Sequence, residues 1–282
     1  MKKLLLLGSA GKVGTAVRSA FAGDYLVVGK GRDDFDAADP GEASRLVRED
    51  RYDLVVNAVA FVGIDQCERE PARAFAVNAL FPGRLAELSA ELGFTLVHFS
   101  TDAVFSGRSS APYLEEDCPQ PINMYGVTKH AGDCLVQAAA ARHYLIRVSL
   151  QFGESPKSNQ FVEKMLARIG GGQKRLDIAA DIVCSPSYSR DVAARVRDLV
   201  AEAAPYGLYH VANEGQASLY ELMAEVVSQL RLDAEVRPAS HRDFPSVGRK
   251  NTCSLLRSRK IPPLRPWREA VREYCATLAA GR

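Results

Sequence analysis

Tyr125 and Lys129 are the pair of side chains in this sequence best suited to moving a proton. Four residues span about one helical turn, so the phenol and the ammonium would lie on the same face of a helix. A phenol is a weak acid at neutral pH, and we expect the positive charge of Lys129 to lower the pKa of Tyr125. A tyrosine and a lysine four residues apart occur often by chance, so this spacing alone is weak evidence of function. Its value comes from Thr101, which follows an apolar run upstream and adds a hydroxyl, and from a glycine-rich turn near the start of the chain.

That turn follows the first apolar run, residues 4–7, which is typical of a parallel strand buried on both faces. Gly8, Gly11 and Gly14 come next, and a helix is predicted at 15–21. A strand, a glycine turn and a helix N-terminus form a site for a pyrophosphate, because bare N–H groups and the helix dipole favour an anion. An ordinary glycine turn is the alternative, since the Lys-Ser/Thr ending of a P-loop is missing.

Apolar runs alternate with helical periodicity through the first half of the chain. Strands are predicted at 4–7, 25–28, 54–59, 95–100 and 144–149, and helices at 15–21, 44–49, 71–92 and 125–141. This alternation predicts an α/β fold with a Rossmann-like, doubly wound parallel sheet, whose ligands bind beyond the carboxyl ends of the strands. Thr101 lies at such an end.

The second half predicts a smaller C-terminal substrate-binding lobe. We expect a dinucleotide-binding domain at 1–152, rejoined by 184–213 through a helix at 191–203 and a strand at 207–212. The lobe would comprise 153–183 and 214–282, with a last amphipathic helix that opens at Trp267.

Composition excludes several classes of function. The net charge is +2, from 36 basic and 34 acidic residues, so neither nucleic acid nor a membrane is an expected partner. The apolar run after Met1 is too short for a signal peptide. Six cysteines without a CxxC pair favour reduced thiols in the cytoplasm, and no metal site.

The end of the second predicted strand bears on the choice of cofactor. An NAD-preferring site usually has an acid there, whereas this chain has Gly29 followed by Lys30 and Arg32. Either basic side chain would bind a 2′-phosphate, and a solvated turn is equally consistent, given Asp33 and Asp34. We expect NADPH, with NADH possible.

Six stretches along nearly the whole chain carry a family resemblance: GSAGKVG (8–14), VVNAVAFVGIDQCEREPARAFAVNA (55–79), FSTDAVF (99–105), EEDCPQPINMYGVTK (115–129), GLYHVAN (207–213) and RPASHRDFPSVGRKNTCSLL (237–256). Together they resemble the dTDP-4-dehydrorhamnose reductase family of extended short-chain dehydrogenases/reductases. The resemblance implies that Tyr125 is the general acid, that Lys129 holds the nicotinamide ribose, and that Thr101 hydrogen-bonds the substrate carbonyl.

The resemblance also implies two sets of binding residues. Those toward the cofactor are Gly8, Gly11, Lys12, Val13 and Gly14 at the pyrophosphate, Asp36 at the adenine, Ala58 and Ala60 along the pocket, and Asn78 within it. Those toward the substrate are Thr101, Asp102, Val104, Arg249 and Asn251. Without the resemblance, Asp36 reads as a surface carboxylate and Asn78 as a helix cap, while Arg249 and Lys250 read as surface charges.

The sequence departs from the family at four places. Ala103 stands where a tyrosine is usual, and Leu150-Gln151-Phe152 replaces a Trp-x-Tyr run, which removes aromatic surface near the expected sugar pocket. Lys250 replaces a proline. Ala16 replaces the acid through which some relatives dimerise around magnesium, so we expect a monomer or a homodimer that is not metal-linked.

The leading hypothesis is an NADPH-dependent reductase of the 4-keto group of a nucleotide-diphosphate 4-keto-6-deoxyhexose, in deoxysugar biosynthesis. An epimerase or dehydratase of the same superfamily is the second reading, and it would keep its nicotinamide bound. A non-catalytic, nucleotide-binding regulatory subunit is the third, because a relative of the family serves in that way.

Overall fold

The computed structural model describes residues 1–154 and 160–280. Its central sheet is parallel, with strand order β10-β5-β4-β3-β1-β2. These strands are β1 (Lys2–Leu7), β2 (Tyr25–Lys30), β3 (Leu54–Asn57), β4 (Thr95–Thr101), β5 (His143–Val148) and β10 (Gly207–His210). The strand order reverses between β1 and β3, and a ligand of such a sheet binds at this point. The predicted doubly wound sheet is confirmed, including the late strand that rejoins it.

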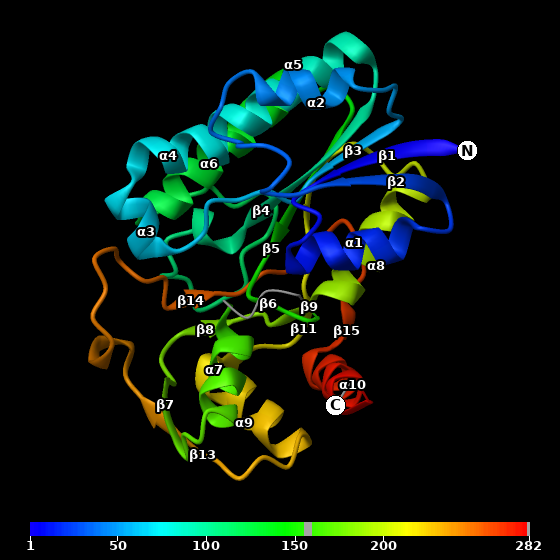
Figure 1. Cartoon of the computed structure of the whole chain (residues 1–282). Coiled ribbons are helices and arrows are strands. Elements are labelled where there is room, and N and C mark those ends of the chain that lie inside the picture. The colour runs from blue at the N-terminus through cyan, green and yellow to red at the C-terminus, as the bar shows by residue number, and fades with distance from the viewer. Residues whose placement is uncertain (155–159, 281–282) are drawn as a thin grey trace.

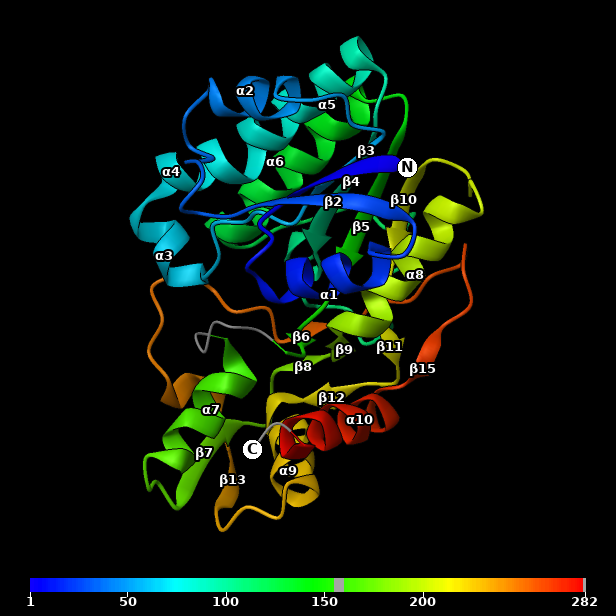
Figure 2. The same cartoon turned by 45° about the vertical axis from the view of Figure 1, so that its right-hand side comes forward.

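Helices cover both faces of the sheet (Figures 1 and 2). One face carries α1 (Lys12–Phe21) and α8 (Ser189–Ala201), which pack on each other. The other carries α2 (Glu42–Arg48), α5 (Phe81–Leu92) and α6 (Met124–Ala139). In β1, Leu4 and Leu6 face the first layer and Leu5 and Leu7 the second, all fully buried, which explains the continuous apolar run.

Several predicted boundaries shift in the structure. The single helix expected at 71–92 is α4 (Pro71–Phe75), a π turn η1 (Ala76–Leu80) and then α5, and it is preceded by an unpredicted helix α3 (Ile64–Arg69). β3 ends at Asn57 instead of residue 59, because the Asn57 side chain accepts a hydrogen bond from the backbone N–H of Val59. β2 and α1 are longer than predicted.

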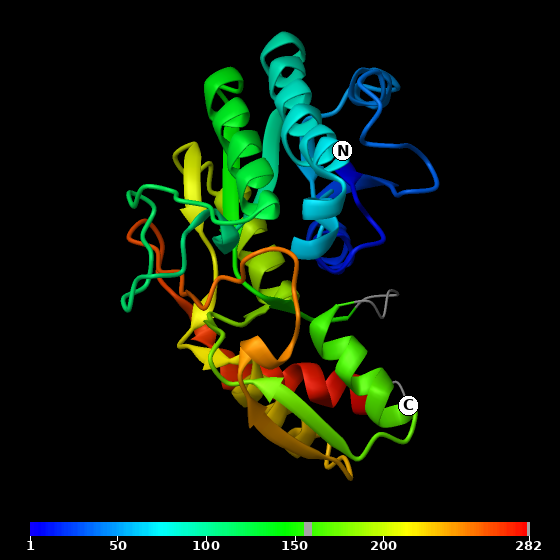
Figure 3. The same cartoon turned by 90° about the vertical axis from the view of Figure 1, so that its left-hand side faces the viewer.

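The remaining elements build the smaller lobe around its own core. Its helices are α7 (Phe161–Gly170), α9 (Leu219–Gln229) and α10 (Trp267–Ala280), which opens at Trp267 as predicted. In Figure 3 the parallel pair β7 (Arg175–Ala179) and β13 (Glu235–Ala239) lies at the opposite end of the molecule from α5 and α6. The expected domain boundaries stay a prediction, and residues 155–159 lie outside the described residues.

Short elements connect the lobe to the sheet. They are β6 (Gln151–Phe152) with β9 (Ser187–Tyr188), β8 (Val183–Cys184) with β12 (Ala217–Ser218) and β14 (Cys253–Ser254), β11 (Asn213–Glu214) with β15 (Leu264–Pro266), and the 3-10 turns η2 (Asp102–Val104) and η3 (His241–Asp243). The segment 244–252 runs from the lobe up to α3, where Asp65 accepts hydrogen bonds from Val247 and Ser246 (Figure 1).

All six cysteines are free, in keeping with the expected reduced thiols. Within the described ranges, no helix has both the length and the apolar character needed to cross a bilayer.

Candidate active site

A cavity of about 750 Å³ opens where the carboxyl ends of β1, β3 and β4 meet. It brings together most of the residues singled out from the sequence. Those that line it are Gly8, Gly11, Lys12, Val13, Arg32, Asp36, Ala58, Ala60, Thr101, Asp102, Tyr125 and Lys129. Gly14, Lys30, Asn78, Val104, Arg249 and Asn251 lie outside its lining.

The glycines of this turn allow neighbouring backbone segments to pack closely against it. Gly8 has a φ of +81°, and a Cβ there would lie 2.9 Å from the carbonyl of Ala58. A Cβ on Gly14 would lie 2.2 Å from the Gly8 oxygen, so Gly14 lets α1 pack on the turn instead of touching a ligand. No side chain caps the N-terminus of α1 at Gly11, which leaves N–H groups for an anion. The backbone therefore fits a pyrophosphate.

Lys12 extends away from that backbone site. Its Nζ forms a 2.8 Å ion pair with Glu163 of α7 and donates to the Gln151 carbonyl at 3.0 Å. Burial lowers the pKa of Lys12, and Glu163 opposes this effect. The Lys12 side chain thus joins the turn to the lobe. We expect the backbone N–H of Lys12, and not its ammonium, to contact a pyrophosphate.

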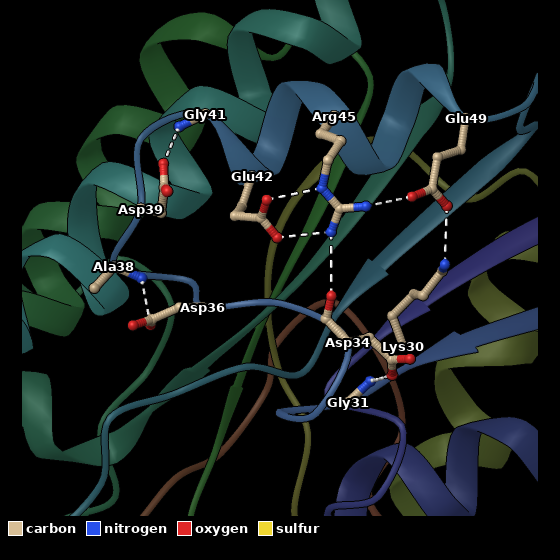
Figure 4. A network of polar contacts seen from close by, with 10 residues as sticks. All are labelled: Lys30, Gly31, Asp34, Asp36, Ala38, Asp39, Gly41, Glu42, Arg45 and Glu49. Carbon is tan, nitrogen blue, oxygen red and sulfur yellow. Dashed lines mark hydrogen bonds and ion pairs between the residues drawn. The ribbon is translucent and has the colours of Figure 1, made fainter.

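The two cations after β2 differ in their surroundings. Lys30 binds Glu49 of α2 at 2.9 Å, and Glu49 in turn binds Arg45 at 2.6 Å (Figure 4). Lys30 is therefore part of a surface network outside the cavity lining, and its expected contact with a 2′-phosphate stays a prediction. Arg32 lines the cavity beside Asp36. Asp36 is exposed, and its carboxylate also binds Arg73 at 3.1 Å.

Helix α6 places Tyr125 next to Thr101. Its N-cap is Asn123, whose Oδ1 accepts from the Gly126 N–H at 2.8 Å. A Cβ on Gly126 would lie 2.2 Å from the Ala103 oxygen, so this glycine allows the helix to pack closely on the segment after β4. Thr101 and Tyr125 consequently line the same cavity, and Thr101 lies close enough to influence the pKa of the phenol.

The proton chemistry of Tyr125 differs from the sequence prediction. Burial raises the pKa of Tyr125, a hydrogen bond with Thr101 opposes this rise, and Asp102 adds to it. The predicted lowering by Lys129 is wrong for this structure, because Lys129 Nζ donates to the Phe99 carbonyl at 2.7 Å. Burial lowers the pKa of Lys129 to about 8, against the opposing effect of Asp133. The phenol thus stays protonated at neutral pH and is available as a donor.

Asp102 joins three segments of the chain at the cavity. Its Oδ2 accepts from Ser149 and Ser254, each at 2.7 Å, and its Oδ1 accepts from Thr101 at 3.1 Å. Burial raises the pKa of Asp102, while these hydroxyls lower it. The two serines orient Asp102. The sequence did not predict these contacts, because both serines are distant from Asp102 along the chain.

Three predicted site residues make structural contacts and do not line the first cavity. Asn78 is fully buried and pairs with both backbone groups of Phe61, at 2.8 and 3.0 Å. Val104 lies in a small core. Asn251 accepts from Asn123 at 3.0 Å and does not line either cavity.

A second cavity, of about 640 Å³, has several cationic side chains in its lining. Arg249 lines it as part of the segment 241–252, and Arg108 and Arg242 join it. Sequence reasoning missed these two arginines. Lys250 also lines it, although its Nζ donates to the Phe244 carbonyl at 2.6 Å.

The parallel sheet with its glycine turn, and a tyrosine and lysine at the same cavity, define the class of this protein. It is a nicotinamide-dependent oxidoreductase.

Comparison with known proteins gives the family. Residues 1–280 match the family model described as RmlD substrate binding domain. The spore coat polysaccharide biosynthesis protein SpsK of Bacillus subtilis is 31% identical over 279 residues, 97% of each chain. The dTDP-4-dehydrorhamnose reductase of Mycolicibacterium smegmatis is 32% identical over 99% of this chain and 87% of its own. The Bacillus anthracis enzyme of that name, solved with NADP, superposes with a TM-score of 0.91, at 26% identity over 98% of this chain and 100% of its own. The chain belongs to the dTDP-4-dehydrorhamnose reductase family.

Proposed function

We propose that this protein reduces the 4-keto group of a nucleotide-diphosphate 4-keto-6-deoxyhexose with NADPH. The observation that carries the proposal is a single cavity lined by the glycine turn at one end and by Tyr125, Thr101 and Lys129 at the other. A dinucleotide held at the turn extends toward the phenol, where a sugar carbonyl has room to bind.

The residues present fit the cofactor. Backbone N–H groups of Lys12 and Val13 hold the pyrophosphate, and Ala58 and Ala60 line the path along the strand ends. Arg32 faces the 2′-phosphate, and the NADP in the Bacillus anthracis structure supports this choice. The bound nicotinamide supplies a hydride.

Tyr125 supplies the proton. As the carbonyl carbon is reduced, its oxygen gains negative charge and becomes basic, so the Oη–H of Tyr125 transfers a proton to it. The Thr101 hydroxyl turns from Asp102 to donate to the same oxygen and stabilises the charge as it forms. The ammonium of Lys129 leaves the Phe99 carbonyl for the ribose hydroxyls and stabilises the phenolate that remains.

In this proposal, the second cavity binds the nucleotide end of the substrate. Arg108, Arg242 and Arg249 line it and make none of the ion pairs found among the described residues, so their charges are available to a diphosphate. Leu150 and Gln151 line the first cavity, where they contact the sugar, whereas Phe152 is buried against Tyr188. The sugar pocket is thus less aromatic than the family pattern.

The test mixes the purified protein with NADPH and a panel of nucleotide-diphosphate 4-keto-6-deoxyhexoses, and follows nicotinamide absorbance and sugar products together. Oxidation of one NADPH for each sugar reduced supports the proposal. Product without NADPH oxidation indicates an epimerase or dehydratase, and cofactor binding without turnover of any sugar indicates a regulatory subunit.

A further inference from the structure

His98 is a fully buried histidine that the mechanism above does not use, and it lies between Asn57 and Lys129. Asn57 and His98 are direct partners on the neighbouring strands β3 and β4. Their side chains alternate with those of Val56 and Val97, so both point toward the helix layer that contains α6. The imidazole consequently lies beneath the cavity, with one nitrogen toward each neighbour.

Hydrogen bonding fixes the tautomer of this imidazole. The Val59 N–H donates to Asn57 Oδ1 at 3.1 Å, which turns the amide NH₂ of Asn57 toward His98. Asn57 Nδ2 lies 3.1 Å from His98 Nδ1, and an amide nitrogen can only donate. Nδ1 is therefore the acceptor. Burial lowers the pKa of His98 well below its usual value, so the ring is neutral and its one proton is on Nε2.

The proton on Nε2 faces Lys129. The distance from His98 Nε2 to Lys129 Nζ is 3.3 Å, and Nζ also donates to the Phe99 carbonyl. An ammonium has no acceptor to offer an N–H, whereas a neutral amine has one lone pair. On α6, Asp133 favours the ammonium, and Asp133 is itself paired with Arg147 of β5 at 3.1 Å.

We propose that His98, held in its Nε2–H tautomer by Asn57, is a positioning residue that donates to Nζ of Lys129 and favours the neutral amine. The link to rate rests on the proposed function: reduction needs the ammonium of Lys129 beside the developing phenolate, so turnover falls when Lys129 loses its proton. His98 thereby moves the upper pH limit of turnover below the value that burial of Lys129 alone would give. His143 on β5 is the other titratable group that faces His98.

The tautomer can be measured without any substrate. In protein with ¹⁵N-labelled histidine, long-range ¹H–¹⁵N spectra distinguish a protonated Nε2 from a protonated Nδ1, and His98→Gln assigns the signals. We expect protonated Nε2 on a ring that is neutral at pH 7. A protonated Nδ1 in the wild-type protein would overturn the proposal, whether or not the protein reduces sugars.

Asn57→Asp tests the effect on Lys129. A carboxylate keeps the shape and still accepts from Val59, but it requires a proton on His98 Nδ1, so Nε2 becomes an acceptor for the ammonium. The ¹³Cε resonance of Lys129, assigned with Lys129→Met, should then titrate at a pH higher by about 1 or more, and the alkaline limb of NADPH oxidation should move with it. His143→Gln is the matched control and should move neither.

Each result decides the proposal. An unchanged titration of Lys129 in folded Asn57→Asp protein, judged by its melting temperature, contradicts it. His98→Leu, which removes the N–H donor and adds no charge, is measured beside Asn57→Asp and also serves if Asn57→Asp does not fold. A rise in the titration pH of Lys129 in that variant supports the proposal, and an unchanged value contradicts it. If Lys129 shifts as expected but no panel sugar is reduced, the positioning role holds and the proposed reaction fails.

Discussion

Lys12 and Glu163 form an ion pair with a 2.8 Å separation, and it joins the glycine turn of the sheet to helix α7 of the lobe. The Lys12 side chain is 1% exposed and that of Glu163 is 13% exposed. Removing one partner leaves a buried charge, which typically costs 3–5 kcal/mol, whereas removing both costs much less. We therefore expect Lys12→Met to lower the free energy of unfolding by about 3 kcal/mol.

Urea denaturation checks this expectation, with Lys12→Met/Glu163→Gln as the comparison. The double variant should regain most of the loss, since neither charge remains. A double variant as unstable as the single one would show that the loss comes from packing and not from the unpaired carboxylate.

Tyr125→Phe isolates the proton transfer. The ring still packs and Lys129 still reaches the ribose, so NADPH affinity and melting temperature should change little. Single-turnover oxidation of NADPH should slow by about 10²–10⁴ because the general acid is lost. Tyr206→Phe, which removes a hydroxyl bound to Arg142 far from the cavity, serves as the control. Near wild-type turnover in folded Tyr125→Phe protein would refute the assignment of the acid.

Arg32→Ser and Lys30→Ser form a matched pair that tests cofactor choice. Arg32 lines the cavity, and a charge-assisted contact to phosphate contributes about 1.5–3 kcal/mol, so its loss should reduce the NADPH over NADH preference at least about tenfold. Lys30 is held by Glu49, and its loss should leave the preference within about twofold. The dissociation constants of both cofactors, from nucleotide fluorescence, measure this. A larger effect at Lys30 than at Arg32 would reverse the assignment.

Asp181 should contribute to the pH dependence of stability. Burial opposes ionisation, but hydrogen bonds from Ser240 and His241 lower the pKa of Asp181 to about 2, from an ordinary value of 3.8. A carboxyl with a lowered pKa stabilises the fold above its unfolded pKa, and this stabilisation is lost as the pH falls from about 4 to about 2.

Asp181→Asn should therefore show a melting temperature that is lower than wild type at pH 6 and closer to wild type near pH 3. Asp177→Asn is the control and should follow the wild-type curve. A constant difference between Asp181→Asn and wild type across this range would mean that the effect of the variant is not electrostatic.

The sheet was predictable because each strand carries its own signal. The run Leu4 to Leu7 is buried on both faces, and Gly8 and Gly14 mark the turn through positions that no other residue fits. These are local properties, and a sequence displays them directly. The π turn η1 was not predictable in this way, because it retains helical spacing on both sides.

The electrostatics of the site depend on distant residues and were less predictable. Lys30 and Arg32 look alike in sequence, and only the position of Glu49 on α2 separates them. The spacing of Tyr125 and Lys129 placed both at the cavity, but it could not show that the Phe99 carbonyl holds the ammonium or that burial governs both pKa values.

Asn123 gives the molecule one more property. Its Oδ1 caps helix α6, while its Nδ2 donates to the Arg249 carbonyl at 2.9 Å and to Asn251 at 3.0 Å. One amide therefore fixes the distance between the end of the cavity that holds Tyr125 and the segment that carries Arg249. In the proposed complex, Asn123 would link the site of the carbonyl to the site of the diphosphate, so we expect a change at this one amide to disturb both ends of the bound substrate together.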